Sequence, residues 1–257
     1  MGIHTSGKIK SLLNQWEPNT VVTSQRLKAL GITPQNVQGY VANAWFERVG
    51  GRVLKRPNET LTWESCLYSL QSQLDMPVHV GALTALESEG NIHYLRLDLP
   101  KVYLFSEPGV TLPKWYKEYA WGVELEHVQT KLLPVGLGVT ERLMAGFKLC
   151  TSSAERAILE LLHLAPQRFD LVEASQIVEG LRTLRPSLMQ KLLEACNSIK
   201  VTRLFLYLAE LANLPVFSHL DATKFDLGTG DRALVKDGAY VAKYHLVLPQ
   251  ALVTHGD

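Results

Sequence analysis

The stretch TPQNVQGYVANAWFERVGGRVLKR, which runs from Thr33 to Arg56, predicts a capped helix followed by a tight hairpin. Thr33 offers a hydroxyl N-cap, and Pro34 suits the first helical position because the backbone donor there has no partner within the helix. Gly50-Gly51 separates two runs rich in β-forming residues, which is typical of a two-residue hairpin turn. The fold should therefore be built around this helix and the hairpin that follows it.

Two shorter helices are expected before this stretch. Residues 8–16 carry apolar side chains at helical spacing, and the Pro18-Asn19 pair ends that pattern. A second helix should run from residue 23 or 24 to residue 30, with a hydroxyl cap at its start and Gly31 just beyond its end. Three helices with a glycine turn before the third, followed by a hairpin, indicate a winged helix-turn-helix over residues 8–56.

The third helix of this motif should present two different faces. The apolar residues at three-to-four spacing, which we expect to face the core, are Val37, Val41, Ala44 and Trp45. The other side carries amides and small residues, namely Gln35, Asn36, Gln38, Gly39, Ala42 and Asn43. Gln and Asn side chains can pair bidentately with adenine in the major groove, so this face is predicted to read DNA bases. A merely solvated face, or a face that docks a protein, fits the same pattern.

The first 60 residues are basic. They hold eight Lys and Arg against three Glu, a net charge of +5, and since the whole chain carries +1 the remainder must carry −4. This separation suggests that one end of the chain meets a polyanion. Cations on the hairpin should bind phosphates, which supply affinity rather than sequence choice. The predicted DNA-binding residues are Ser24, Gln25, Arg26, Lys28, Gln35, Asn36, Gln38, Gly39, Asn43, Arg48, Arg52, Lys55 and Arg56. Lys200 and Arg203 are candidates for additional basic contacts, with solvated charges as the alternative.

The whole chain is expected to be α+β. We predict a winged-helix DNA-binding domain with linking helices at residues 1–95 and a helix-rich α+β domain at residues 96–257. Helices are predicted at 62–74, 81–89, 153–165, 172–184, 186–197 and 201–212, and strands at 92–97, 102–106, 123–133, 233–236 and 240–248.

Motifs for catalysis, metal binding or membrane insertion are missing from the sequence. The three cysteines lie far apart, and no His, Asp or Glu cluster has ligand spacing, so no metal or cofactor is expected. The run DLGTGDR, Asp226 to Arg232, lacks phosphate-loop spacing and should be a turn between strands. Charges interrupt every apolar segment before the ~20 residues that a membrane span needs. We therefore expect a cytoplasmic protein that is not an enzyme and has no membrane partner.

Four separated blocks resemble one known family. They are VHVGALTALESEGNIHYL (78–95), TSSAERAILELLHLAP (151–166), IVEGLRTLRPSLMQKLLEACNSIKVTRLFLYLAE (177–210) and FDLGTGDRALVKDGAYVAKYHLVLP (225–249). In this order they resemble the AbiEi antitoxins of type IV, abortive-infection toxin-antitoxin systems, which act in phage defence. Asp231 departs from the family pattern, where a basic residue is expected.

The resemblance implies a transcriptional repressor with an antitoxin role. Its winged helix would bind inverted repeats in double-stranded operator DNA and repress its own operon. Its C-terminal domain would counter a nucleotidyltransferase-like toxin, and the type IV label implies that direct contact with the toxin is not required. Dimerisation on DNA is left open. Three alternatives remain: a winged helix that docks a protein, a transcriptional regulator without an antitoxin role, and an enzyme that modifies the toxin or its target.

Overall fold

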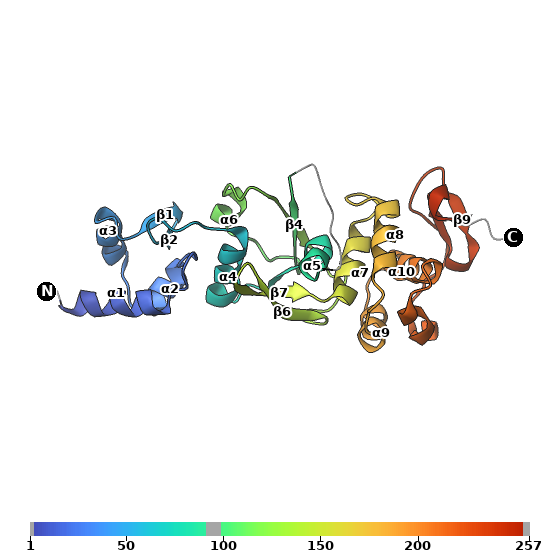
Figure 1. Ribbon diagram of the computed structural model, residues 1–257, viewed down its shortest axis with the longest axis horizontal. Helices are drawn as coiled ribbons and strands as arrows, with labels where there is room; N and C mark the ends of the chain where they lie inside the picture. Colours follow the sequence, from blue (N-terminus) through green and yellow to red (C-terminus); the bar gives the residue numbers. More distant parts are fainter. Residues whose placement is uncertain (1–2, 91–98, 254–257) are drawn as a thin grey trace. The chain divides into compact units, whose positions relative to one another are not determined.

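A computed structural model describes residues 3–90 and 99–253, with side chains from residue 9 onward in the first helix. The chain forms two compact units. Unit 1 comprises Met1–Val78, Gly109–Glu124 and Glu141–Leu149, and unit 2 comprises His79–Pro108, Leu125–Thr140 and Cys150–Asp257. Figure 1 labels the elements along the chain. Because two later segments return to unit 1, the units do not follow a single cut near residue 95.

The first part of unit 1 is the predicted winged helix-turn-helix. Its elements are α1 (Ile3–Gln15), α2 (Ser24–Ala29), α3 (Pro34–Ala42), β1 (Glu47–Gly50) and β2 (Val53–Lys55). The two strands pair antiparallel, with a register shift between Arg48 and Gly50. The α+β fold class is thus confirmed, with the winged helix at its start.

Local capping fixes the turn between α2 and α3. The Thr23 side chain accepts from the Arg26 backbone N–H at the start of α2. Thr33 and Asn36 form a reciprocal capping box at the start of α3. Gly31 lies between the two helices with a φ of 67°, in the left-handed region that glycine enters without steric cost.

The core of the winged helix corrects one sequence prediction. Its buried members are Ile9, Leu12, Trp16, Val22, Leu27, Ile32, Tyr40, Phe46 and Leu54, with Leu30, Val37 and Val41 packed at the edge. Ala44 and Trp45 were predicted to lie in this core but are exposed. Ala44 has a φ of 56°, so the chain leaves the helix there and the helical stripe does not continue. Tyr40 and Phe46 fill the space instead.

Unit 1 continues with α4 (Trp63–Leu74) and α6 (Lys114–Glu118). Residues 21–23 run as a short extended segment between β2 and α4. Val22 exchanges both backbone hydrogen bonds with Leu54. On the other side, the Gln73 amide accepts from Thr23 N at 2.9 Å and donates to Val21 O at 2.7 Å. Ser69 Oγ of α4 also accepts from Val21 N at 3.3 Å, so two α4 side chains complete the pairing of this segment.

Five strands form one sheet in the order β5-β4-β3-β7-β6. Their bounds are β3 (Val78–Val80), β4 (Lys101–Ser106), β5 (Glu124–Gln129), β6 (Val139–Met144) and β7 (Phe147–Ser152). The strands predicted at 102–106 and 123–133 correspond to β4 and β5. The strand predicted at 92–97 lies outside the described residues.

Unit 2 contains a second set of helices, besides those of unit 1. Its α-helices are α5 (Ala82–Ser88), α7 (Ala154–Leu164), α8 (Leu171–Gly180), α9 (Pro186–Glu194) and α10 (Ile199–Leu211). A small sheet of β8 (Arg232–Ala233), β9 (Ala239–Val241) and β10 (Leu246–Leu248) has the order β8-β10-β9. Short 3₁₀ helices occupy Pro215–His219, Ala222–Lys224, Ala242–Tyr244 and Gln250–Leu252. The buried faces of α5, α7, α8, α9 and α10 share one hydrophobic core.

Candidate nucleic-acid interface

The predicted base-reading face of α3 lies in solvent. Gln35, Gln38, Gly39 and Asn43 are exposed, and Asn36 is half-buried. No atom lies within 4 Å of a Cβ added at Gly39, so the helix surface is open at this point. The amides thus gather on one accessible side of one short helix, as the sequence predicts.

Two of these amides also stabilise the ends of α3. Asn36 Oδ1 accepts from the Thr33 N–H at 3.0 Å and from its hydroxyl at 2.8 Å. Asn43, the C-cap residue, donates from Nδ2 to Gly39 O at 2.8 Å. The side chains of Gln35 and Gln38 make no hydrogen bond within the described part of the chain, so their amides are the ones available to a base edge.

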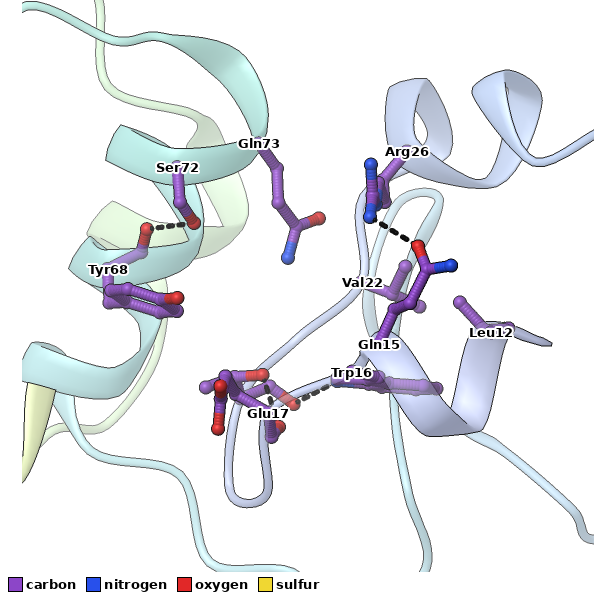
Figure 2. Close-up of a pocket in the computed structure, with 10 residues that line it drawn as sticks. Leu12, Gln15, Trp16, Glu17, Val22, Arg26, Tyr68, Ser72 and Gln73 are labelled. Atoms are coloured by element: carbon purple, nitrogen blue, oxygen red, sulfur yellow. Dashed lines mark hydrogen bonds between the residues drawn. The ribbon is translucent and has the colours of Figure 1, made fainter. Parts of the chain in front are cut away.

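The predicted residues of α2 divide into two groups. Ser24, Gln25 and Lys28 are exposed, whereas Arg26 is half-buried. Arg26 Nη2 donates to Gln15 Oε1 at 2.9 Å, on the wall of a cavity of about 230 Å³ within unit 1. Figure 2 shows this pair, with Gln73 of α4 across the cavity. The guanidinium of Arg26 is therefore already engaged beside α1.

The four cations predicted to lie on the hairpin differ in whether partners within the chain hold them. Arg48 and Arg52 are exposed, and among residues 3–90 and 99–253 their guanidinium groups make only one long contact, of 3.4 Å from Arg48 to Gly51 O. Lys55 forms an ion pair with Glu47 at 2.9 Å and donates to Glu59 O at 2.9 Å. The structure thus leaves two wing cations free to reach phosphates and uses Lys55 in the hairpin itself.

Arg56 serves the fold of unit 1. Its guanidinium lies 5.2 Å from the centre of the Trp16 ring and donates to the carbonyls of Leu13, at 3.0 Å, and Trp16. Glu59 is 3.5 Å away. The Leu13 carbonyl lies in the last turn of α1 and the Trp16 carbonyl just beyond it, where backbone oxygens lack helical partners, so Arg56 satisfies them. The sequence-based phosphate role for Arg56 does not fit this geometry.

Lys200 and Arg203 do not form an additional basic surface. Arg203 is 2% exposed and donates to the carbonyls of Leu227, Gly228 and Gly230. Lys200 is half-buried, donates to the carbonyls of His163 and Ala165, and its pKa is lowered by burial. The predicted DNA contacts of Lys200 and Arg203 are therefore wrong, because hydrogen bonds to backbone carbonyls within the chain already satisfy both charges.

The same contacts explain the glycine-rich loop at 226–232. Its carbonyl oxygens face the Arg203 guanidinium, which is the opposite of an anion-binding arrangement. Gly228 has a φ of 57°, and a Cβ there would lie 2.4 Å from Ile199. Asp231 accepts from the Tyr240 hydroxyl at 2.8 Å and pairs with His245 at 2.9 Å. The loop is thus a structural turn.

Trp45 is a candidate nucleic-acid contact that the sequence analysis does not include. It is 54% exposed directly after α3 and stacks on Tyr40, with ring centroids 5.8 Å apart and an interplanar angle of 7°. Its position follows from the helix end at Asn43, because Asn is a common residue at helix C-termini. That signal could have placed Trp45 outside the helical stripe.

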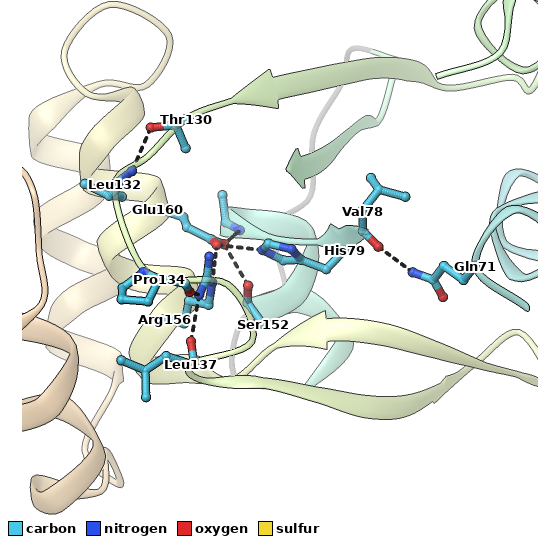
Figure 3. A network of polar contacts seen from close by, with 11 residues as sticks. Gln71, Val78, His79, Thr130, Leu132, Pro134, Leu137, Ser152, Arg156 and Glu160 are labelled. Carbon is cyan, nitrogen blue, oxygen red and sulfur yellow. Dashed lines mark hydrogen bonds and ion pairs between the residues drawn. The ribbon is translucent and has the colours of Figure 1, made fainter. Parts of the chain in front are cut away.

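Unit 2 contains a buried polar network around Glu160 (Figure 3). The carboxylate accepts from His79 Nε2 at 2.8 Å, Ser152 Oγ at 2.8 Å, Arg156 Nε at 2.7 Å and the Ala82 N–H at 3.1 Å. Burial acts to raise the pKa of Glu160, but His79, Arg156 and the Ser152 hydrogen bond lower it below its ordinary value. The hydrogen bonds thus compensate the burial of this carboxylate, as native proteins do for buried polar groups.

A second buried carboxylate, Glu155, lies in the first turn of α7, five residues before Glu160. Burial acts to raise its pKa, yet hydrogen bonds from Arg185 lower it to about 2. Arg185 donates to both carboxylate oxygens, at 2.9 and 2.8 Å. Glu155 and Arg156 thus take different partners, Arg185 and Glu160.

Within residues 3–90 and 99–253, no group of three or more His, Cys, Asp and Glu side chains is placed to hold a metal ion. No helix in this part of the chain has the length and apolar character that crossing a bilayer requires.

Family comparison covers almost the whole chain. The family model described as "Transcriptional regulator, AbiEi antitoxin N-terminal domain" matches residues 5–97. The model described as "Transcriptional regulator, AbiEi antitoxin, Type IV TA system" matches residues 99–249. The chain belongs to the AbiEi antitoxin family. This AbiEi protein is therefore a member of a family of transcriptional regulators that are antitoxins of type IV systems, as the four sequence blocks indicate.

One solved structure shares the fold of this AbiEi chain. The crystal structure of the RV2827C protein from Mycobacterium tuberculosis is similar with a TM-score of 0.59 and 13% sequence identity. The likeness covers 95% of this chain and 91% of that one. A comparison with curated proteins gives no match.

Proposed function

We propose that this AbiEi antitoxin binds double-stranded operator DNA through its winged helix and represses its own operon. The observation that carries the proposal is the exposed side of α3, where the side-chain amides of Gln35 and Gln38 have no hydrogen-bond partner within the described residues. The capping box and Asn43 hold the two ends of this helix. A rigid helix with free amides suits base recognition in the major groove.

The other exposed residues of the winged helix would have different roles in DNA binding. Gly39 lets the α3 backbone approach the groove wall, because nothing projects there. Arg48 and Arg52 on the wing, with Ser24, Gln25 and Lys28 on α2, would contact phosphates. Lys55, Arg56, Lys200 and Arg203 are left out of this set, because each is held by partners within the chain.

Operator symmetry follows from the same geometry. Inverted repeats would be bound by two copies of the chain, related by the two-fold axis of the DNA. Recognition helices of such a pair reach major grooves about one helical turn, or a multiple of it, apart. The two copies need meet only on the DNA.

The antitoxin role is proposed for the C-terminal half of the chain. It would counter a nucleotidyltransferase-like toxin encoded beside the antitoxin gene, in the cytoplasm and without enzymatic activity. A toxin antagonised through its target would need no stable complex with this chain.

Band-shift titrations test the DNA-binding proposal. The probes are a duplex of the sequence upstream of the gene that encodes this chain and a shuffled duplex of the same composition. Gln38→Ala should cost about 1–3 kcal/mol on the upstream duplex and little on the shuffled one. Arg52→Gln should weaken binding to both equally. Equal, weak binding of the unmodified protein to both probes would defeat specific repression, and no binding together with a stable toxin complex would favour a protein-docking winged helix.

A further inference from the structure

The wing of the helix-turn-helix touches a segment from much later in the chain. A Cβ added at Gly50, at the end of β1, would lie 2.8 Å from the Cβ of Trp115 and 3.6 Å from its Cα. Both residues belong to unit 1. The approach is too close for any side chain at residue 50, so the wing backbone rests directly on α6. Residues 114–118 are thereby placed beside the hairpin.

Aromatic contacts hold α6 in this position. Tyr116 is fully buried, and its hydroxyl donates to Trp63 O, at the start of α4, at 3.1 Å. Trp121 donates from its indole N–H to Tyr116 O at 2.7 Å, and its ring lies 5.3 Å from that of Tyr116. The Trp115 ring meets Tyr116 edge-on at 5.7 Å. One side of α6 is therefore fixed against α4 and the wing.

The other side of α6 is cationic and exposed. Lys114 and Lys117 are three residues apart, which places both on one helical face. Lys114 lies 3.7 Å from Glu118, but their side chains are 83% and 62% exposed, so this pair is weak and screened by salt. The side chain of Lys117 forms no ion pair or hydrogen bond with the residues that the structure describes, and its backbone N–H donates to Pro113 O. These ammonium groups are available to an anionic partner.

We infer that α6 is part of the DNA-binding surface: Lys114 and Lys117 contact operator phosphates beyond those that Arg48 and Arg52 reach. The inference rests on the proposed function and extends it to a segment outside the helix-turn-helix. DNA phosphates attract any cation within reach, without regard to base sequence. A long, flexible lysine supplies a mobile point charge, which suits phosphate contact rather than base reading. The wing and α6 together would then hold one stretch of DNA backbone.

The test uses the full-length protein and a double variant, Lys114→Gln with Lys117→Gln. Its matched control is Lys191→Gln with Lys236→Gln, which removes the same net charge from two exposed lysines of unit 2. Binding to the upstream duplex and to its shuffled counterpart is measured between 50 and 200 mM salt. Each phosphate contact contributes a slope of about −0.9 in log affinity against log salt, so at 0.15 M salt each lysine strengthens binding by about 5.5-fold relative to 1 M salt.

The expected result is a loss of about thirtyfold for the α6 variant, equal on both duplexes, with a salt slope shallower by about 2. The control variant should bind like the unmodified protein, and all three should melt at the same temperature. If the unmodified protein binds specifically while the α6 variant matches the control, the inference is overturned and the proposed function stands. If the unmodified protein binds neither duplex, the inference about α6 and the proposed DNA-binding function are both overturned.

Discussion

Replacing Glu160 by alanine should destabilise unit 2 strongly. The change removes the acceptor of four hydrogen bonds and leaves the buried Arg156 guanidinium without its carboxylate. Arg156 keeps only the carbonyls of Pro134 and Leu137, at 2.8 and 2.7 Å. Breaking a buried ion pair from one side costs about 3–5 kcal/mol. Glu160→Gln should cost less, about 1.5–3 kcal/mol, because its amide oxygen still accepts hydrogen bonds.

Urea denaturation followed by far-UV circular dichroism measures this loss. All five tryptophans lie in unit 1, so tryptophan fluorescence reports that unit separately. The matched control is Glu179→Ala, which removes an exposed carboxylate from α8 and should change the free energy of unfolding by less than about 0.5 kcal/mol. A loss below about 1 kcal/mol for Glu160→Ala would refute the idea that this network stabilises the fold.

Acid should reduce the contribution of the Glu160 carboxylate to the free energy of unfolding. The pKa of Glu160 is lower in the folded protein than its unfolded value of about 4.3. Its contribution is therefore complete above that unfolded value and is lost as the pH falls through the folded pKa. The stability gap between the unmodified protein and Glu160→Gln should narrow below about pH 4. Glu155, with a pKa of about 2, adds to the acid sensitivity of both proteins equally.

Two further variants separate structural from DNA-binding roles in unit 1. Arg56→Gln should lower the free energy of unfolding by about 1–3 kcal/mol, since it leaves the carbonyls of Leu13 and Trp16 unsatisfied. Its salt slope of DNA binding should be that of the unmodified protein, and a slope shallower by about 1 would restore a phosphate role to Arg56. Gly50→Ala should push the wing away from Trp115 and weaken binding to specific and shuffled DNA alike, as salt-titrated band shifts would show. Undiminished affinity would mean that the wing does not need α6 for binding.

Local signals predicted the helix-turn-helix well. The Thr33 cap, Pro34 and Gly31 determine the conformation of only a few neighbouring residues. The local sequence is therefore enough to place the ends of α2 and α3. The register of the core was harder. A left-handed residue at Ala44 interrupts the helical period, and the assignment of Trp45 to the core failed for that reason alone.

Charged residues were predicted less well because their partners are distant in sequence. Arg56 is bonded to carbonyls about 40 residues earlier, and Arg203 to a loop about 25 residues later. Neither partner carries a sequence signal, since any residue has a carbonyl. By contrast, the Arg156–Glu160 pair has the i,i+4 spacing at which helical side chains meet, so a local signal for it exists, although our sequence analysis does not predict this pair. The partner of Glu155 has no such signal, because Arg185 lies 30 residues away.

The return of residues 109–124 to unit 1 also determines how the chain can be dissected. A truncation near residue 95, where sequence analysis places the domain boundary, would delete α6 and its contacts with Gly50 and Trp63. The remaining fragment would expose apolar surface that Tyr116 covers in the full chain. Weak DNA binding by such a fragment would then have two explanations: lost lysines and a loosened wing. Point substitutions at Lys114 and Lys117 remove the charges while leaving the aromatic contacts in place. They therefore distinguish the effect of lost lysines from that of a loosened wing, which the truncation does not.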